Sequence, residues 1–382
     1  MEMQQTQVMV RENQKRNHIS IIPIILFLFV AIINIIFLRK YEKICLIIQF
    51  LLIAGVFFAI VPQLSIKYVS YMLVILYCGI ATILNNSGLG VIITFVTLIM
   101  ILILGKETFL TRKEEHYLDI SFLVFIFLII VIYYKKDGMY YISRLNQEKM
   151  NPNSMATLIL SFGFMLHNAV RNFYKEKRHI LNAAVFVCIL YLLKETGART
   201  AMLSYVVFIA LILVFPKLKM NNKAEENRRL TRMVLLACIT NIVVVFVYIQ
   251  LYYYIDGDEL IVFGKNLFTG REAIWKEAIE LYSNNFWWGI SSKHIFCGQW
   301  ENTHNGMLSI LCHLTIFGLI AFCILYSSSV KCKSGEIINK YKAAAMIAFL
   351  IEATFENLIV DSTFFFVLIP FILNKRRIEV DE

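Results

Sequence analysis

The chain has 382 residues, of which 59% are hydrophobic, and a formal net charge of +10. An ordinary soluble domain is about 45–50% apolar, so this composition excludes one. Runs of about 18 or more apolar residues recur along the chain, as expected of helices that cross a bilayer. The positive charge must therefore be interpreted by its position along the chain before it is taken as a sign of nucleic-acid binding.

Apolar stretches that could cross a membrane begin at residues 19–38, after a polar N-terminal segment. This first stretch has no small-residue cleavage site, so we interpret it as a retained signal anchor. Further stretches lie near 44–62, 68–84, 89–105, 118–134, 154–170, 180–193, 200–215, 233–254, 305–326, 343–356 and 362–373. The last two are short and could form one kinked unit. The sequence predicts an all-α polytopic transmembrane helical bundle of about twelve spans, forming a single integral membrane domain over residues 1–382.

The distribution of Lys and Arg predicts the orientation of this bundle. Of the 37 basic residues, 24 fall on the side that holds both termini and 13 fall on the other side. The richer side is cytoplasmic by the positive-inside rule. We therefore expect a multi-pass plasma-membrane protein with both termini in the cytoplasm and one large extracytoplasmic loop over 255–303. Because the basic residues lie in short loops beside the spans, we expect no nucleic-acid partner.

Neither the cysteines nor the clustered acidic residues have the spacing of a metal-binding motif. The eight cysteines lie mostly inside apolar stretches and form no Cys-x-x-Cys pair, so neither a zinc site nor a disulfide framework is indicated. Asp256, Asp258 and Glu259 could hold a divalent ion, but they lack the spacing of a calcium loop, and a solvated turn is the simpler interpretation. The sequence predicts no metal and no cofactor.

The large loop contains a predicted helix that would present an arginine. Thr269 and Glu272 have the spacing of a capping box, and the apolar residues behind them recur at helical intervals. This pattern predicts an amphipathic helix on or near the membrane surface. Arg271 would project from its first turn, beside backbone N–H groups, and both features favour a phosphate or diphosphate there. The alternative is an arginine that meets lipid headgroups.

Two other polar residues lie at the predicted outer ends of spans. His304 opens an apolar stretch, where a histidine could take a proton from a hydroxyl near neutral pH, or could simply be an interfacial residue with a satisfied hydrogen bond. Arg199 begins another stretch, where an arginine either binds an anion or snorkels to the interface.

Two carboxylates, Glu352 and Glu356, are spaced i, i+4 and would share one helix face in an apolar setting, with Asp361 just beyond. Carboxylates inside a membrane segment usually mark a functional cavity. A structural role is the alternative, in which they pair with Arg199 or another buried cation. We take Glu356 as a candidate substrate-binding residue.

Four short motifs, in this order, resemble the O-antigen polymerase and ligase family of bacterial envelope proteins. They are Asn151-Pro152-Asn153 leading into a span, Gly197-Ala198-Arg199-Thr200 opening another, Thr269-Gly270-Arg271 followed by Ile274-Trp275, and His304-Asn305 followed by Gly318. They cover roughly residues 150–320. The chain departs from the family at two positions: family members often have glycine where Thr315 stands and an acidic residue where His313 stands.

The resemblance implies an inverting glycosyltransferase with a lipid-diphosphate-linked glycan as donor. In this family the arginines are thought to hold the diphosphate and the histidine to assist the acceptor hydroxyl. The resemblance therefore implies that His304, Arg271 and Arg199 are catalytic, and that the two arginines also bind substrate. We add three aromatic residues of the loop as substrate-binding candidates, because their faces can stack on sugar rings or lie at the headgroup level; these are Trp287, Trp288 and Trp300.

These observations together predict a polymerase of lipid-diphosphate-linked oligosaccharide repeat units that makes capsule, exopolysaccharide or O-antigen at the outer face of the plasma membrane. Its expected partners are the polyprenyl-diphosphate-linked donor and the lipid bilayer, with a flippase and a chain-length regulator as candidates. A ligase that passes the glycan to another acceptor is not separated from this interpretation. A transporter of the same glycans would show broken helices in two related halves, and no such symmetry is visible. A non-catalytic scaffold would not need His304 and both arginines.

Overall fold

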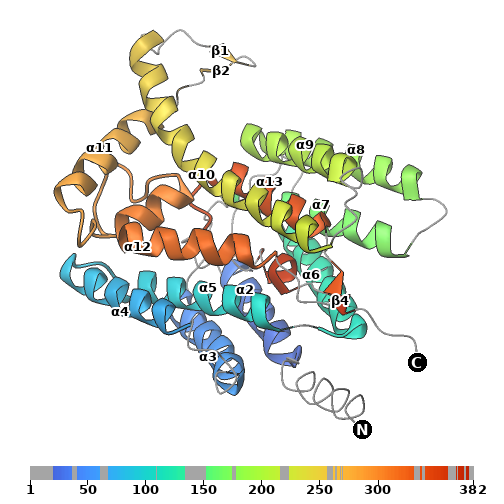
Figure 1. Cartoon of the computed structure of the whole chain (residues 1–382). Helices are drawn as coiled ribbons and strands as arrows, with labels where there is room; N and C mark the ends of the chain where they lie inside the picture. The colour runs from blue at the N-terminus through green and yellow to red at the C-terminus, as the bar shows by residue number, and fades with distance from the viewer. Residues whose placement is uncertain are drawn as a thin grey trace.

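A computed structural model of the chain is shown in Figure 1. It describes residues 20–36, 41–60, 68–108, 110–133, 152–173, 178–215, 223–255, 261–262, 265–266, 268, 270–330, 336–337, 340–359, 367, 369–373 and 376–377, and the statements below concern these residues. The helices are α2 (Ile22–Ile36), α3 (Glu42–Ile60), α4 (Val69–Leu84), α5 (Leu89–Glu107), α6 (Arg112–Tyr133), α7 (Pro152–Phe173), α8 (Arg178–Thr196), α9 (Arg199–Val214), α10 (Lys223–Ile255), α11 (Arg271–Asn284), α12 (Gly306–Ser328), α13 (Lys340–Ala353) and α14 (Ile369–Leu373).

The described strands are very short and form two antiparallel pairs. Strand β1 (Ile261–Val262) pairs with β2 (Lys265–Asn266) beyond the end of α10, with Ile261 opposite Asn266. Strand β3 (Glu336–Ile337) pairs with β4 (Arg376–Arg377), with Glu336 opposite Arg377. The prediction of an all-helical bundle is confirmed.

An α-helix lies at each of the predicted apolar stretches, but not every helix could cross a membrane by itself. Five helices of the described chain are long and apolar enough by length and composition: α3, α5, α8, α10 and α12. Three shorter apolar helices, α2, α4 and α9, join them. The count of twelve spans therefore stays a prediction. Part of the last stretch, including residues 362–366, lies outside the described residues.

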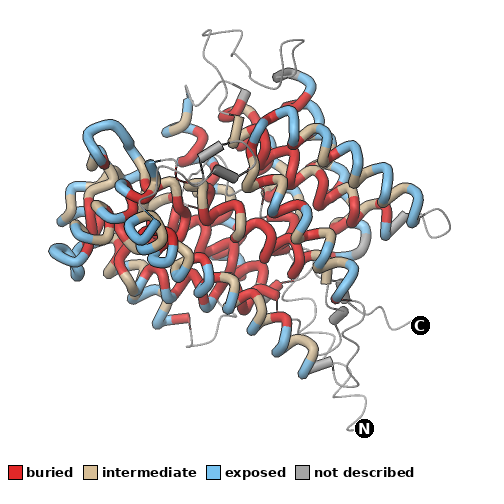
Figure 2. Tube along the Cα trace, turned by 90° about the horizontal axis from the view of Figure 1, so that it is seen from above, coloured by how far each residue is buried: buried red, intermediate tan, exposed pale blue. Residues whose placement is uncertain are grey.

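Helix α12 is the central element of the bundle. In Figure 1 it lies between α4 and α5 on one side and α10 and α13 on the other. Burial follows from that position: 18 of the 23 residues of α12 are buried inside the protein, whereas most described side chains of α8 at the periphery are exposed or partly exposed. Figure 2 shows the same pattern, with buried turns along the middle of the molecule and exposed turns at its rim. A helix that is apolar all round and exposed at the rim suits contact with lipid.

The chain bends sharply inside α12. Thr315 has φ 64° and ψ 178°, a combination that an L residue with a branched side chain rarely adopts. The bend interrupts the helical hydrogen bonds, and groups from other elements take their place. The Cys312 carbonyl accepts from Ile290 N–H at 2.6 Å, and Ile316 N–H donates to the Tyr282 hydroxyl at 3.1 Å. The segment after α11 is therefore joined to the middle of α12.

The predicted outer loop is a folded unit with its own apolar core. Its buried side chains come from α10, the residues just before α11, α11 itself, the segment 290–296 and the first half of α12; they are Val245, Tyr248, Ile249, Phe268, Ile274, Trp275, Ala278, Tyr282, Ile290, Phe296, Leu308 and Cys312. Gly289 shows how tightly this unit packs, because a Cβ there would lie 2.4 Å from the Cys312 carbonyl oxygen and its φ is +75°. Only glycine fits such a position.

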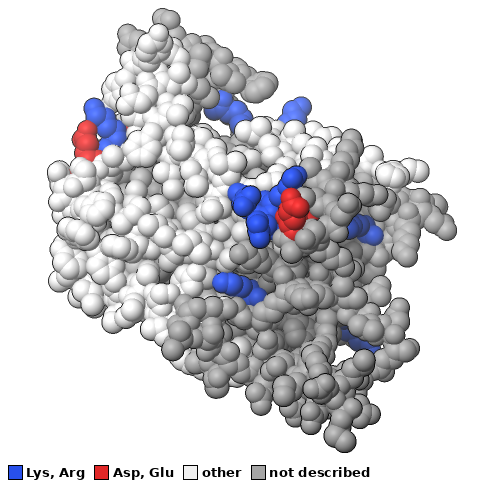
Figure 3. Space-filling view, viewed as in Figure 1, with Lys and Arg blue, Asp and Glu red and all other residues white. Residues whose placement is uncertain are grey.

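Charged side chains gather in a few places on the surface. Figure 3 shows a face that is largely uncharged among the described residues, with small groups of charge over α11 and over the N-terminal end of α10. The charged residues of these two helices include the ion pairs Lys276–Glu280 on α11 and Arg229–Glu225 on α10. A surface without charge between these two groups of charged residues is what a bundle in contact with lipid requires.

Candidate functional site

Helix α11 places Arg271 at its first residue, as predicted, but the predicted cap is wrong. The N-cap is Gly270, with φ 85° and no side-chain cap, and the predicted cap Thr269 lies outside the described residues. Glu272 still reaches back as a capping-box acid does, because its Oε1 accepts the Gly270 N–H at 3.0 Å. The left-handed turn at Gly270 thus directs the chain from the β1–β2 segment into α11 and fixes where Arg271 emerges.

Arg199 is placed by a second left-handed glycine. Helix α8 ends at Thr196, Gly197 has φ 69°, and α9 begins at Arg199. The Thr196 hydroxyl accepts the Ala198 N–H at 3.2 Å, which closes this turn. The motif that resembles the family therefore forms a tight reversal between two helices, with the arginine at the helix start.

Arg199 and Arg271 line the same cavity, although 72 positions separate them in the sequence. The cavity has a volume of about 140 Å³. Its walls come from α7, the α8–α9 turn, α11 and the end of α13, and the lining residues are Asn153, Gly197, Ala198, Arg199, Thr200, Ala201, Arg271, Glu352 and Glu356. Two cationic side chains and two acidic ones thus face one small space.

We predicted from their spacing that Glu352 and Glu356 share one helix face, and this prediction is wrong. Helix α13 ends at Ala353, so Glu352 lies in its last turn and Glu356 lies beyond it. The cause is the turn at Thr354 and Phe355, whose N–H groups bond to Ile351 and Glu352 in a tighter pattern than the α-helix. Both carboxylates nevertheless reach the cavity. Asp361 lies outside the described residues.

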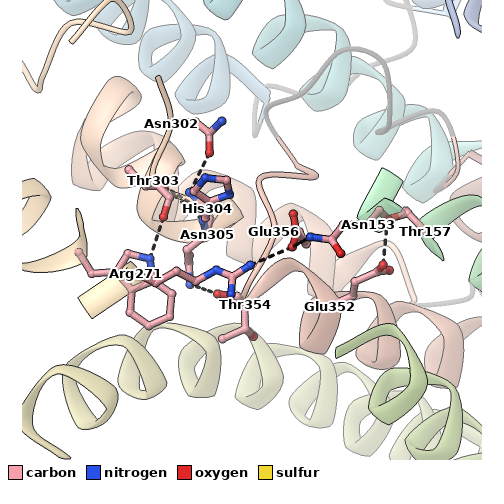
Figure 4. A network of polar contacts seen from close by, with 11 residues as sticks. Asn153, Thr157, Arg271, Asn302, Thr303, His304, Asn305, Glu352, Thr354 and Glu356 are labelled. Carbon is pink, nitrogen blue, oxygen red and sulfur yellow. Dashed lines mark hydrogen bonds and ion pairs between the residues drawn. The ribbon is translucent and has the colours of Figure 1, made fainter. Parts of the chain in front are cut away.

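Polar contacts tie this cavity to α7 (Figure 4). Arg271 Nη2 lies 3.1 Å from Glu356 Oε1, and the side chains are 21% and 14% exposed. Asn153 Nδ2 donates to the same Glu356 oxygen at 2.6 Å. Thr157, one turn further along α7, donates from its hydroxyl to Glu352 Oε1 at 2.8 Å. Glu356 therefore pairs with a cation, as the structural alternative required, and its partner is the half-buried Arg271.

The sequence analysis did not predict Asn153 and Thr157 as site residues. One signal was present, because Asn153 closes the Asn151-Pro152-Asn153 motif at the start of α7. Thr157 carries no signal by itself, because a threonine four residues into a helix most often bonds to its own backbone. Its single hydroxyl proton is shared between the Asn153 carbonyl, at 3.0 Å, and Glu352 Oε1.

His304 lies in the segment before α12 and has φ 50°. Its two neighbours are fully buried and hold the backbone on both sides. The Thr303 carbonyl accepts from Trp275 Nε1 at 2.7 Å, and the Asn305 side chain caps α12 by accepting Leu308 N–H at 2.8 Å. Trp275 is one turn after Arg271 on α11, so the same helix positions the arginine and the backbone beside His304.

The Asn305 amide extends this network to α10 and α13. It donates to Asn241 Oδ1 at 3.2 Å and to the Thr354 carbonyl at 2.8 Å. Asn241, in the middle of α10, donates to the Leu350 carbonyl at 2.8 Å and to Thr354 Oγ1 at 2.9 Å. The segment with His304, the turn that carries Glu356 and the long helix α10 are thus held in one arrangement.

The environment of His304 keeps its imidazole neutral. Burial, with the charge of Arg271 as a second cause, lowers the pKa of His304 from 6.5 to about 4. The effect of Arg271 shows that the two side chains are close, and Figure 4 shows His304 on the side of Arg271 away from Glu352. Trp300 packs edge-on against the His304 ring with centroids 5.2 Å apart. A neutral imidazole can accept a proton, so His304 has the protonation state that a base needs.

The three predicted tryptophans do not lie together. Trp300 borders His304, but Trp287 and Trp288 lie beside α4 and the second half of α12. The Trp287 ring stacks with Phe317 at 6.5 Å, and the Trp288 ring stacks with Tyr77 at 6.2 Å. Trp287 and Trp288 are 59% and 45% exposed and do not line the cavity. Their position fits the headgroup-level alternative better than contact with a ligand in the cavity.

The described residues hold no group of three His, Cys, Asp or Glu that could bind a metal ion. The acidic turn at Asp256, Asp258 and Glu259 lies outside them. In chemical terms, the cavity offers two guanidinium groups for an anion, two carboxyl groups for hydrogen-bond donors and a neutral imidazole beside one arginine.

Comparison with known proteins identifies the part of the chain that carries this geometry. Residues 184–323 match the family model described as O-antigen ligase. This match includes Arg199, Arg271 and His304, whereas Asn153, Glu352 and Glu356 lie outside it. A search of curated proteins and a search of solved structures gave no match. The predicted family resemblance is thereby confirmed over residues 184–323 of this chain, whose long apolar helices are those of a membrane protein.

Proposed function

We propose that the protein polymerises lipid-diphosphate-linked oligosaccharide repeat units, for capsule, exopolysaccharide or O-antigen, by an inverting glycosyl transfer. The carrying observation is that Arg199 and Arg271, far apart in sequence, line one cavity with His304 beside it. Two arginines in a partly enclosed site form strong bidentate contacts with phosphate oxygens. The neutral histidine supplies a proton acceptor next to that anion site.

In the proposed reaction, the hydroxyl of the acceptor glycan attacks the anomeric carbon of the donor. A new C–O bond forms there, and the bond between that carbon and the diphosphate oxygen breaks. The electron pair leaves with the diphosphate, whose growing charge Arg199 and Arg271 stabilise. The hydroxyl proton passes to the His304 imidazole.

Binding of the donor would change the charges around Arg271 and His304. In the structure Arg271 pairs with Glu356, so a diphosphate has to share or take over that contact. Asn153 holds the same carboxylate and can keep it in place when the arginine turns to the phosphate. The diphosphate also offsets the positive charge that lowers the pKa of His304, so donor binding should make the imidazole a stronger base.

A ligase is the second candidate function, and it would use the same residues on a different acceptor. The matched family includes such an activity by its description. Polymerase and ligase differ in the hydroxyl that attacks, so the product separates them: a polymerase joins repeat units to one another without any other acceptor.

We also propose that the cavity opens on the extracytoplasmic side and that both termini are cytoplasmic, on the basis of the 24 basic residues on one side and 13 on the other. Single cysteines at Lys293 and Arg229, which are both exposed, test this in intact cells on a background without native cysteines. An impermeant thiol reagent should label position 293 alone. Labelling of position 229 alone would reverse the orientation.

The test of the function is polymer formation from purified lipid-linked repeat units in proteoliposomes. The wild-type protein should produce ladders of joined units, and Arg271→Lys should be strongly impaired because lysine keeps the charge but loses the planar fork. Arg229→Lys, at an exposed ion pair on α10, is the matched control and should leave the rate unchanged. Wild-type protein that transfers units only to an added foreign acceptor would identify a ligase. Arg271→Lys at the wild-type rate would remove the arginine from the reaction.

A further inference from the structure

Glu352 is the residue of the cavity whose role the proposed reaction leaves open. It is 1% exposed and lines the cavity at the end of α13. One oxygen, Oε1, bonds to the Thr157 hydroxyl at 2.8 Å. The other, Oε2, is buried without a hydrogen-bond partner among the described residues. A buried polar atom without a partner is costly, so a group that enters the cavity lined by Glu352 would satisfy this oxygen after a small rotation of the carboxyl group.

The surroundings limit which group this can be. A phosphate oxygen is disfavoured beside an ionised carboxylate, because both groups then offer only acceptor oxygens. An ammonium group is disfavoured, because it would add a third positive charge to a cavity of about 140 Å³ in which two carboxyl groups already balance Arg199 and Arg271. A neutral hydrogen-bond donor remains, and a hydroxyl fits best: it can donate to a carboxylate and can also accept from a protonated carboxyl group.

The position of this group relative to the arginines identifies where it lies on the donor. Because Glu352 and both arginines line one small cavity, the hydroxyl must be close to the diphosphate that the arginines bind. In a lipid-diphosphate-linked glycan, the nearest hydroxyl groups are those of the sugar bonded directly to the diphosphate.

On the basis of the proposed function, we infer that Glu352 binds a hydroxyl group of the first sugar of the donor and so makes the cavity select a sugar-bearing diphosphate over a bare one. Thr157 is the positioning residue for this contact, since its hydroxyl bond holds Oε1 and leaves Oε2 without a partner among the described residues. Glu356 differs, because its Oε1 already holds Arg271 and Asn153. The two carboxylates therefore have separate tasks: one orients the anion-binding arginine and the other recognises the sugar.

The experiment compares two probes on the full-length protein in nanodiscs: lipid-linked repeat units extracted from the strain that makes them, and polyprenyl diphosphate without sugar. Glu352→Ala should weaken binding of the sugar-bearing probe about tenfold or more, as expected for loss of a hydrogen bond to a charged group. Binding of the bare diphosphate should be unchanged or tighter, because a negative charge near it has been removed. Glu352→Gln keeps the shape and an acceptor oxygen, so it should weaken the sugar-bearing probe less than Glu352→Ala does.

Gln49→Ala is the matched control, because Gln49 is also 1% exposed and its amide atoms have no partner within the described chain, but it lies on α3 away from the cavity. It should leave the affinity for both probes unchanged. Unchanged affinity of both Glu352 variants for the sugar-bearing probe would overturn the inference and leave the proposed function intact. Equal losses for both probes would overturn it as well, since they indicate a structural role. A wild-type protein that binds neither probe would instead refute the proposed function.

Discussion

Buried amide side chains near His304 are hydrogen-bonded to other elements, whereas those at the other side of the bundle have amide atoms without partners in the described chain. On α10 and at the start of α12, the side chains of Asn241 and Asn305 form hydrogen bonds that cross from one element to another. On α2 and α3, Asn34 and Gln49 are as deeply buried, but amide atoms of both lack a partner within the described chain. The first set fixes relative positions of elements, whereas apolar packing alone specifies register less sharply.

This difference indicates where the protein requires a defined geometry. The polar network links α11, the segment before α12 and the end of α13, which carry Arg271, His304 and Glu356 respectively. Apolar packing of α2 and α3 needs only to hold the bundle in the bilayer. A substitution in the network should therefore affect the reaction, and a similar substitution in α2 or α3 should not.

The largest effect is expected at His304. Replacement by alanine should lower the polymerisation rate by about two to four orders of magnitude, the usual contribution of a general base. Donor binding should largely survive, because both arginines remain. His294→Ala is the matched control: His294 lies in the same segment between α11 and α12, pairs with Glu277 at 2.9 Å and is outside the cavity. Wild-type rates from His304→Ala would end the base assignment, and loss of donor binding would place His304 at the diphosphate instead.

The pH profile should show a smaller but distinctive effect of the same site. Burial and the charge of Arg271 lower the pKa of His304 to about 4, so the imidazole stays neutral well below the usual 6.5. We therefore expect kcat/KM to remain high as pH falls to about 5 and to drop only near pH 4. Donor binding measured at each pH separates this limb from loss of affinity. A limb centred near pH 6.5 would show that the free enzyme lacks the described environment.

The same shift has a consequence for stability, and its sign can be worked out. The unfolded chain has an ordinary histidine that binds a proton near pH 6.5, whereas folded His304 binds one only near pH 4. Between these values the unfolded state holds more protons, so the contribution of His304 to stability is complete above about pH 6.5 and is lost as pH falls toward 4.

A pair of asparagine substitutions tests the comparison directly. Asn241→Leu removes three hydrogen bonds, each worth about 0.6 kcal/mol on average in a membrane protein, so it should cost about 2 kcal/mol of stability and slow the reaction. Asn34→Leu replaces an equally buried amide whose Oδ1 has no partner within the described chain, so it should be neutral or stabilising. Thermal unfolding in one detergent, together with kcat and donor affinity, measures both. Equal losses from the two variants would remove the distinction between the regions.

The sequence was sufficient to predict where the helices lie and which arginines are candidate site residues. It was not sufficient to predict that these arginines line one cavity. Apolar runs of membrane length predict helices because backbone groups in lipid must bond within the segment, and every predicted stretch contains one. The family motifs identified Arg199, Arg271 and His304. The cavity depends on contacts between residues about 200 positions apart, such as Asn153 with Glu356, and local patterns carry no information on these. Helix periodicity also failed after Ala353, where a tight turn replaces the expected α-helix.

The smallest expected effect concerns the bend in α12. Thr315 adopts φ 64° and ψ 178°, a conformation that costs a residue with a side chain about 1–3 kcal/mol and that glycine adopts readily. Family members often have glycine at this position, which fits the observed backbone.

Thr315→Gly should relieve this strain, although glycine gives back up to about 1 kcal/mol through the greater freedom of the unfolded chain. The comparison that isolates the backbone term is with Thr315→Ala, which removes the same methyl and hydroxyl groups but keeps the Cβ. Thr315→Gly should be more stable than Thr315→Ala by about 1 kcal/mol in thermal unfolding, with the polymerisation rate retained. Equal stability of the two variants would mean that α12 is not strained at this bend. A gain in stability combined with a loss of rate would mean that the strain itself helps to hold the segment 285–290 against α12, and through it the helix α11 that carries Arg271.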